Sequence, residues 1–163
     1  DSEDILKCYN LGHRWTYDSD SDTFIKDGLQ DKQSPQILFI ERCLEFLKDN
    51  GKLGIVLLES IFGMPKYRYV VDYIQRKTKI LAIVTMPEDL FQPNTHAKCC
   101  VVICEKVSEP SKEDYPIFMA DVKWCGHDSR GNPTLRKDAS GKMVLLDDIP
   151  NVATIFHQGP SKA

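Results

Sequence analysis

The chain has 163 residues, of which 42% are hydrophobic and 28% are charged, and this suits one globular domain with a buried core. No run of about 18 apolar residues occurs, so we expect no membrane span. No basic-then-apolar leader is visible, so we expect a cytoplasmic location. The formal net charge is −3. A stand-alone nucleic-acid binder usually carries a basic surface, so any contact with DNA would be local or would need other parts of a longer protein.

Residues 1–33 are polar and include the acidic run Asp18-Ser-Asp-Ser-Asp22, which has no apolar periodicity. We therefore expect a polar lead loop over this segment. Within it, Gly12-His-Arg-Trp15 combines a base, a cation and an aromatic ring. This stretch is either a surface loop anchored by its tryptophan or a loop that faces a substrate or DNA.

A helix and then a buried strand follow. Ser34 suits the N-cap of the helix, and Pro35 suits its first position. Apolar residues recur at helical spacing as far as Leu47, and Gly51 is expected to end the helix in a left-handed conformation. Residues 53–58 are apolar on both faces, which predicts a central strand of a sheet.

A second helix, around residues 67–74, separates this strand from another buried strand at residues 80–86. The next strand is predicted at residues 97–105. The connection before it has only about ten residues and no helix, which is too short for a parallel crossover. Strand 97–105 should therefore run against strand 80–86, whereas strands 53–58 and 80–86 should run parallel as neighbours or near neighbours. Ligands of such sheets bind beyond the carboxyl ends of the strands, where Glu59-Ser60 and Met86-Pro87 fall.

After the polar segment 108–114, the sequence pattern changes to one that is typical of a half-buried strand. Apolar positions alternate with polar ones from Phe118 to Trp124, which predicts a half-buried strand. Residues 143–146 are a short candidate partner strand. Asp148 is a plausible N-cap for a last helix with one apolar face, formed by Ile149, Val152, Ala153 and Phe156. We therefore divide the chain into a lead loop (1–33), an α/β segment (34–107) and a strand-turn-helix extension (108–163).

The six cysteines do not suggest a metal centre or a disulfide framework. No Cys-x-x-Cys pair occurs, and the side chains of His96, Cys99, Cys100 and Cys104 diverge along an extended strand. We expect reduced thiols and no metal. The sequence also contains no Gly-rich nucleotide loop, and its four scattered histidines define no catalytic triad.

Residues 39–58, 79–91 and 96–106 together resemble the second half of the catalytic domain of adenine-N6 DNA methyltransferases, especially the modification subunits of type I-like restriction systems. The core of the resemblance covers residues 34–107, and residues 118–131 are similar to the extension that follows in that family. The resemblance implies a partial Rossmann-like α/β sheet with a reversed last strand. It also implies methyl transfer from S-adenosylmethionine to the exocyclic amine of a flipped adenine, with DNA and specificity and restriction subunits or domains as partners.

The departures from the family pattern bear directly on activity. The family carries a Gly-rich cofactor loop and an Asn-Pro-Pro-aromatic catalytic motif upstream of the segment that matches residues 53–58, and neither occurs in this chain. We therefore expect a fragment of a longer enzyme, with no catalytic residue of its own, inactive alone and without tight binding of S-adenosylmethionine. Two alternatives stay open: a non-catalytic α/β module that docks to another subunit, and a methyltransferase with a small-molecule or RNA substrate.

One family feature has a counterpart here. Phe91 matches an aromatic that contacts the flipped base, and stacking on such a ring is worth about 1–3 kcal/mol. Phe91 is either this contact or a cap on the core beneath the loop. Pro93, Asn94 and His96 are expected to share the same DNA-facing loop. Lys98 is either a phosphate contact or a solvated lysine at the start of a strand.

Overall fold

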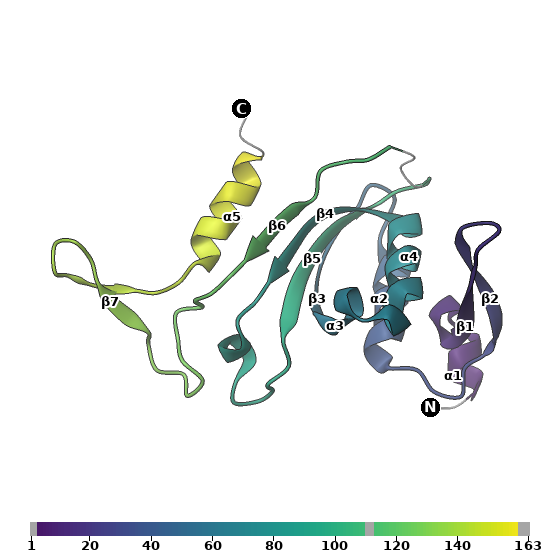
Figure 1. The fold of residues 1–163 in the computed structure, drawn as a ribbon, viewed down its shortest axis with the longest axis horizontal. Coiled ribbons are helices and arrows are strands. Elements are labelled where there is room, and N and C mark those ends of the chain that lie inside the picture. Colours follow the sequence, from purple (N-terminus) through teal and green to yellow (C-terminus); the bar gives the residue numbers. More distant parts are fainter. Residues whose placement is uncertain (1–2, 110–112, 160–163) are drawn as a thin grey trace. The chain divides into compact units, whose positions relative to one another are not determined.

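The computed structural model describes residues 3–109 and 113–159, so residues 110–112 of the connection before the extension lie outside the described residues (Figure 1). The chain divides into two units. Unit 1 comprises Asp1–Leu53, Ser60–Ile80 and Cys104–Asp114, and unit 2 comprises Gly54–Glu59, Leu81–Ile103 and Tyr115–Ala163. The long strands contribute residues to both units.

Unit 1 begins with regular structure. Its elements are α1 (Glu3–Lys7), the 3-10 helix η1 (Asn10–Gly12), the hairpin of β1 (His13–Asp18) and β2 (Thr23–Leu29), α2 (Pro35–Phe46), α3 (Ser60–Gly63), η2 (Pro65–Tyr67) and α4 (Arg68–Lys77). The lead loop expected over residues 1–33 is therefore wrong in its local structure. The acidic run is the turn of the hairpin, where Asp18 Oδ2 accepts the Ser21 hydroxyl at 2.6 Å and Asp22 takes φ +49°. Strands β1 and β2 were not predicted because both of their faces carry polar residues. The division of the sequence into three segments stays a prediction.

Helix α2 begins at Pro35 as predicted and buries Ile37, Ile40 and Leu44. The expected left-handed cap at Gly51 is wrong, because the helix ends at Phe46 and Asn50, with φ +60°, takes the left-handed conformation. Gly51 is needed for a different reason. A Cβ at this position would lie 2.7 Å from the Lys48 carbonyl oxygen, so only glycine permits this close approach of the chain.

A buried carboxylate ties α2 to the start of unit 1. Glu41 is 1% exposed. Its Oε1 accepts the backbone N–H of Asn10 at 2.9 Å and the Asn10 side-chain amide at 2.8 Å, and its Oε2 accepts the backbone N–H of Leu11 at 2.8 Å. The charge is buried but fully hydrogen-bonded, which is the condition under which a buried carboxylate is tolerated.

Four strands form the main sheet in the order β3-β5-β4-β6. Their bounds are Lys52–Leu58 for β3, Thr78–Thr85 for β4, Cys99–Lys106 for β5 and Phe118–Asp121 for β6. Backbone bonds join Asn50 to Lys106 and Glu59 to Lys98, so the start of β3 meets the end of β5. The bonds from Val107 to Lys77 and from Met86 to Cys99 give the same result for β4 and β5. Strand β5 therefore runs against both neighbours, and the predicted reversed strand is confirmed.

The lateral order of the sheet differs from expectation in three respects. Strand β3, predicted to be central, is at the edge of the described sheet, and the reversed strand β5 lies between β3 and β4 rather than at the end. Strand β6 joins the same sheet, parallel to β4, whereas β8 (Met143–Leu145) pairs with β7 (Leu135–Lys137). Apolar residues on both faces of a strand indicate that the sheet is covered above and below. They do not indicate which strands lie beside that strand in the sheet.

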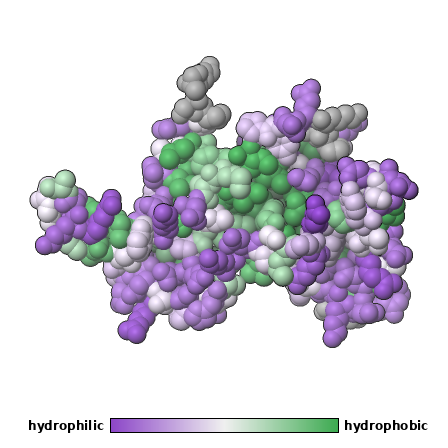
Figure 2. Space-filling view, viewed as in Figure 1, coloured by the Kyte–Doolittle hydropathy of each residue, from purple (hydrophilic) through white to green (hydrophobic). Residues whose placement is uncertain are grey.

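In unit 2, helix α5 (Ile149–Gln158) covers one face of the sheet beside β6 (Figure 1). The rings of Phe118 and Phe156 meet at a centroid distance of 5.4 Å. Between helix and sheet remains an apolar cavity of about 210 Å³, and apolar side chains gather on this face in Figure 2. The cavity is lined on the helix side by Ile149, Val152, Ala153, Phe156 and His157. This confirms the apolar helix face predicted from the sequence. Within the described residues, no helix is long and apolar enough to cross a membrane.

Candidate functional site

The carboxyl ends of three strands meet around one polar cavity in unit 2. Residue Glu59 follows β3, the segment Thr85–Asp89 ends β4 and begins the 3-10 helix η3 (Glu88–Phe91), and Asp121 ends β6. This cavity, the strand-end cavity, measures about 430 Å³ and is lined by Glu59, Thr85, Met86, Pro87, Glu88, Asp89, Lys98, Asp121, Val122 and Lys123. This is the edge at which the sequence predicted a ligand, because parallel strands of an open α/β sheet present their sites there.

Backbone bonds between strands fix the walls of this cavity. The N–H of Glu59 donates to the Lys98 carbonyl at 3.0 Å, and the N–H of Met86 donates to the Cys99 carbonyl at 2.9 Å. The N–H of Val122 donates to the Thr85 carbonyl at 3.0 Å, and the Thr85 hydroxyl donates to Asp121 Oδ1 at 2.6 Å. The cavity is therefore held mainly by sheet hydrogen bonds rather than by mobile side chains.

Carboxylates outnumber cations in the lining. Glu59, Glu88, Asp89 and Asp121 face only two lysines, and Lys98 Nζ lies 3.8 Å from Glu88 Oε1. Both members of this pair are at least half exposed, so the pair is weak. A phosphate would meet net negative charge here. Carboxylate oxygens instead suit a ligand that donates hydrogen bonds, such as the exocyclic amine of a nucleobase.

The predicted base-contact residue Phe91 ends η3, and its side chain is 36% exposed. The ring is partly open to solvent, as expected for a contact residue, but it does not line the cavity. Pro93, Asn94 and His96 are exposed in the segment between η3 and β5. Of the five residues predicted to contact DNA, Lys98 alone lines the cavity. Their role in binding DNA stays a prediction.

Sequence reasoning missed several lining residues. Glu88 and Asp89 stand directly after Met86-Pro87, so the position of the strand end was the signal that could have found them. Asp121 and Lys123 were missed for another reason. Their strand was assigned to a separate extension, although it pairs with β4 in the main sheet.

The cysteines of β5 are buried, which lowers the reactivity of their thiols. All six cysteines are free thiols, and Cys99, Cys100 and Cys104 are buried. Burial raises the pKa of Cys100 to about 11 and raises the pKa values of Cys99 and Cys104 in the same direction. Within the part of the chain that the structure describes, no three His, Cys, Asp or Glu side chains are grouped to hold a metal ion.

The lining of the cavity does not fit S-adenosylmethionine. It contains no glycine that would let the backbone approach a cofactor and no aromatic ring that would stack on an adenine. This cavity therefore offers the cofactor no recognisable site.

The family model for N-6 DNA methylases matches residues 8–145. The chain therefore belongs to the N-6 DNA methylase family. A search among curated proteins finds no match.

Two solved structures share the fold. One is described as a class I S-adenosylmethionine-dependent methyltransferase from Listeria monocytogenes, with 21% identity and a TM-score of 0.52 over 74% of this chain. Another comes from a type I restriction–modification system, with 22% identity and a TM-score of 0.51 over 68% of this chain. The matched parts make up 32% and 22% of those chains. This chain thus spans about a third of the first and about a fifth of the second.

Proposed function

We propose that this chain is the second half of the catalytic domain of a DNA methyltransferase that transfers the methyl group of S-adenosylmethionine to adenine N6 in a restriction–modification system. The observation that carries the proposal is the family match over residues 8–145. The reversed direction of β5 supports it, because the resemblance implied a reversed strand in a methyltransferase sheet.

In this proposal the chain supplies some of the residues that contact the target base. Phe91 provides a partly exposed ring on which the base can stack. The groups that bind the cofactor and accept the hydrogen bonds of the target amine during transfer come from another part of the longer protein. DNA, together with specificity and restriction subunits or domains, would be the partners of that protein.

A methylation assay on the longer protein tests this function. We expect it to transfer a labelled methyl group from S-adenosylmethionine to duplex DNA, with N6-methyladenine as the product in mass spectra of digested DNA. Methylation of cytosine, of RNA or of a small molecule alone would contradict the proposal. No transfer by a folded longer protein, tested with its partner subunits, would favour the non-catalytic docking module.

A further inference from the structure

Unit 1 contains a second cavity, to which the proposed methyltransferase function gives no role. It measures about 330 Å³ and lies between the β1–β2 hairpin and helices α3 and α4. This volume is at the lower end of the range of small-ligand pockets. The lining consists of Tyr17, Asp22, Phe24, Ile61, Phe62, Met64, Arg68, Val71, Asp72 and Gln75.

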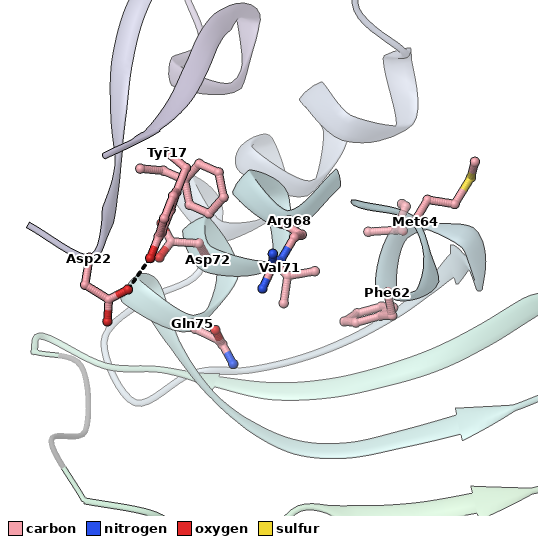
Figure 3. Close-up of a pocket in the computed structure, with 10 residues that line it drawn as sticks. Tyr17, Asp22, Phe62, Met64, Arg68, Val71, Asp72 and Gln75 are labelled. Atoms are coloured by element: carbon pink, nitrogen blue, oxygen red, sulfur yellow. Dashed lines mark hydrogen bonds between the residues drawn. The ribbon is translucent and has the colours of Figure 1, made fainter. Parts of the chain in front are cut away.

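The two ends of this cavity differ in chemistry. Figure 3 shows Tyr17, Asp22 and Asp72 at one end and Phe62 and Met64 at the other, with Arg68 between the two groups. Phe24 packs edge-on against Tyr17 at a centroid distance of 5.4 Å. A ligand with apolar faces and a polar rim would match this arrangement, since rings meet its faces and amide or carboxylate groups meet its rim.

The walls are held in place before any ligand arrives. The Tyr17 hydroxyl donates a hydrogen bond to Asp22, which closes the hairpin turn over the cavity (Figure 3). Arg76 connects the two walls: its Nε lies 2.8 Å from Asp72 Oδ2 on α4, and its guanidinium also bonds Thr23 on β2. A preformed pocket loses less conformational entropy on binding.

One cationic side chain that lines the cavity, that of Arg68, has no partner among the described residues. Across residues 3–109 and 113–159, the Arg68 guanidinium makes no hydrogen bond or ion pair, and the Arg68 backbone N–H donates to the Pro65 carbonyl. Asp72, by contrast, is paired with Arg76. Arg68 lies near enough to Tyr17 to oppose the rise in that residue's pKa, which the hydrogen bond to Asp22 causes. A free guanidinium beside aromatic rings is the combination with which proteins hold a nucleotide, because the cation meets the phosphate and the ring meets the base.

We infer that this cavity, the hairpin pocket, binds an unpaired nucleobase of DNA, with its face on Tyr17, its polar rim toward Asp22 and Gln75, and its phosphate beside Arg68. DNA as the ligand rests on the proposed function. The pocket itself lies wholly within unit 1 and involves neither the strand-end cavity nor Phe91.

The test is fluorescence anisotropy with the 163-residue chain and a labelled 12-nucleotide single strand, compared with an abasic strand of equal length. We expect the abasic strand to bind about 5- to 150-fold more weakly, which corresponds to the stacking of one base on an aromatic side chain. Tyr17→Leu should reduce affinity for the base-containing strand by a similar factor and remove the discrimination. Tyr17→Phe, which keeps the ring, should retain it.

Charge is tested separately. Arg68→Gln should weaken binding of both strands and reduce the salt dependence by about one released counterion. Matched controls are Phe46→Leu, which removes an 82% exposed ring on α2, and Lys77→Gln, which removes an exposed cation at the far end of α4. Neither control residue lines the pocket, so neither variant should change discrimination between the strands.

Three results would overturn the inference: no binding of the single strand, equal affinity for the abasic strand, or the same loss for Tyr17→Leu and Phe46→Leu. Phe62→Leu, from the opposite wall, takes the place of Tyr17→Leu if that variant does not fold. The assay involves no methyl transfer. Tyr17-dependent binding alongside an inactive longer protein would therefore refute the proposed function and leave the hairpin pocket standing.

Discussion

At the residue scale, burial separates side chains that look alike in the sequence. Cys8 is exposed and Cys100 is 1% exposed, and Phe46 and Phe91 differ in exposure by more than twofold, at 82% and 36%. The sequence predicted reduced thiols, because it contains no Cys-x-x-Cys pair and no visible signal peptide. It could not place Phe91, because exposure at a loop depends on neighbours that are distant in the chain.

Cys100 should react with iodoacetamide far more slowly than Cys8 at pH 8, because only the thiolate reacts and burial raises the Cys100 pKa to about 11. Its rate should rise about tenfold per pH unit up to that pKa. The native state keeps a proton that the unfolded chain releases above the ordinary pKa of 9.0, so this thiol also lowers stability as pH rises from 9.0 to about 11. Peptide mapping after a timed pulse gives both rates. Equal labelling of the two thiols at pH 8 would show that β5 opens readily.

Phe91→Ala in the longer methyltransferase should weaken its complex with flipped-base DNA by about 1–3 kcal/mol and slow methylation, while affinity for the cofactor stays unchanged. Binding to DNA with a mismatch at the target adenine, followed by anisotropy, measures the loss. Phe39→Ala, which removes a 60% exposed ring from α2, is the control. A loss of stability of about 3–5 kcal/mol with normal activity would instead make Phe91 a core residue.

At the element scale, the helices and long strands of residues 34–107 were predictable and the hairpin was not. Strong apolar periodicity marks α2, β3 and β4, whereas β1 and β2 alternate weakly and have no central buried residue. The reversed direction of β5 followed from the length of one connection. The pairing of β6 with β4 did not, since partners distant in sequence leave no local signal. For the same reason Asp121, which lines the strand-end cavity, was missed.

Glu41→Leu should destabilise unit 1, because it removes the acceptor of two backbone N–H groups at the start of the chain. A buried donor left without a partner costs about 1–3 kcal/mol, and the Leu11 N–H is such a donor, whereas the Asn10 N–H is only partly buried. Urea unfolding would show a lower midpoint. Glu45→Leu, four residues along the same helix in an exposed pair with Arg42, should leave the midpoint nearly unchanged. Equal shifts in the two variants would remove the structural role given to Glu41.

At the scale of the whole molecule, the chain belongs to the N-6 DNA methylase family and spans 32% and 22% of two solved structures that share its fold. The family motifs that bind the cofactor and the target amine are missing from the sequence, and the strand-end cavity offers no substitute for them. The proposed function rests on the family match and on the order of helices and strands, and not on a catalytic motif. Such an order identifies a fold, and activity depends on residues beyond it.

The 163-residue chain alone should show no binding of S-adenosylmethionine at micromolar concentration and no methylation of DNA. Isothermal titration calorimetry with the cofactor checks the first expectation, and a labelled-methyl assay checks the second. The longer protein is the positive control in both. One site per chain with micromolar affinity would mean that the cofactor site has been misplaced.

The position of β5 between β3 and β4 also has a kinetic consequence. The two strands that flank the gap are complete by residue 85, but the strand that fills it ends at Lys106. During synthesis, β3 and β4 therefore emerge with facing edges that cannot pair until some twenty further residues have left the ribosome. Pairing between distant segments is slow, and unpaired edges are prone to aggregation while they wait. The interval between the synthesis of β4 and the insertion of β5 is accordingly the stage at which a nascent chain of this fold most needs protection by a chaperone.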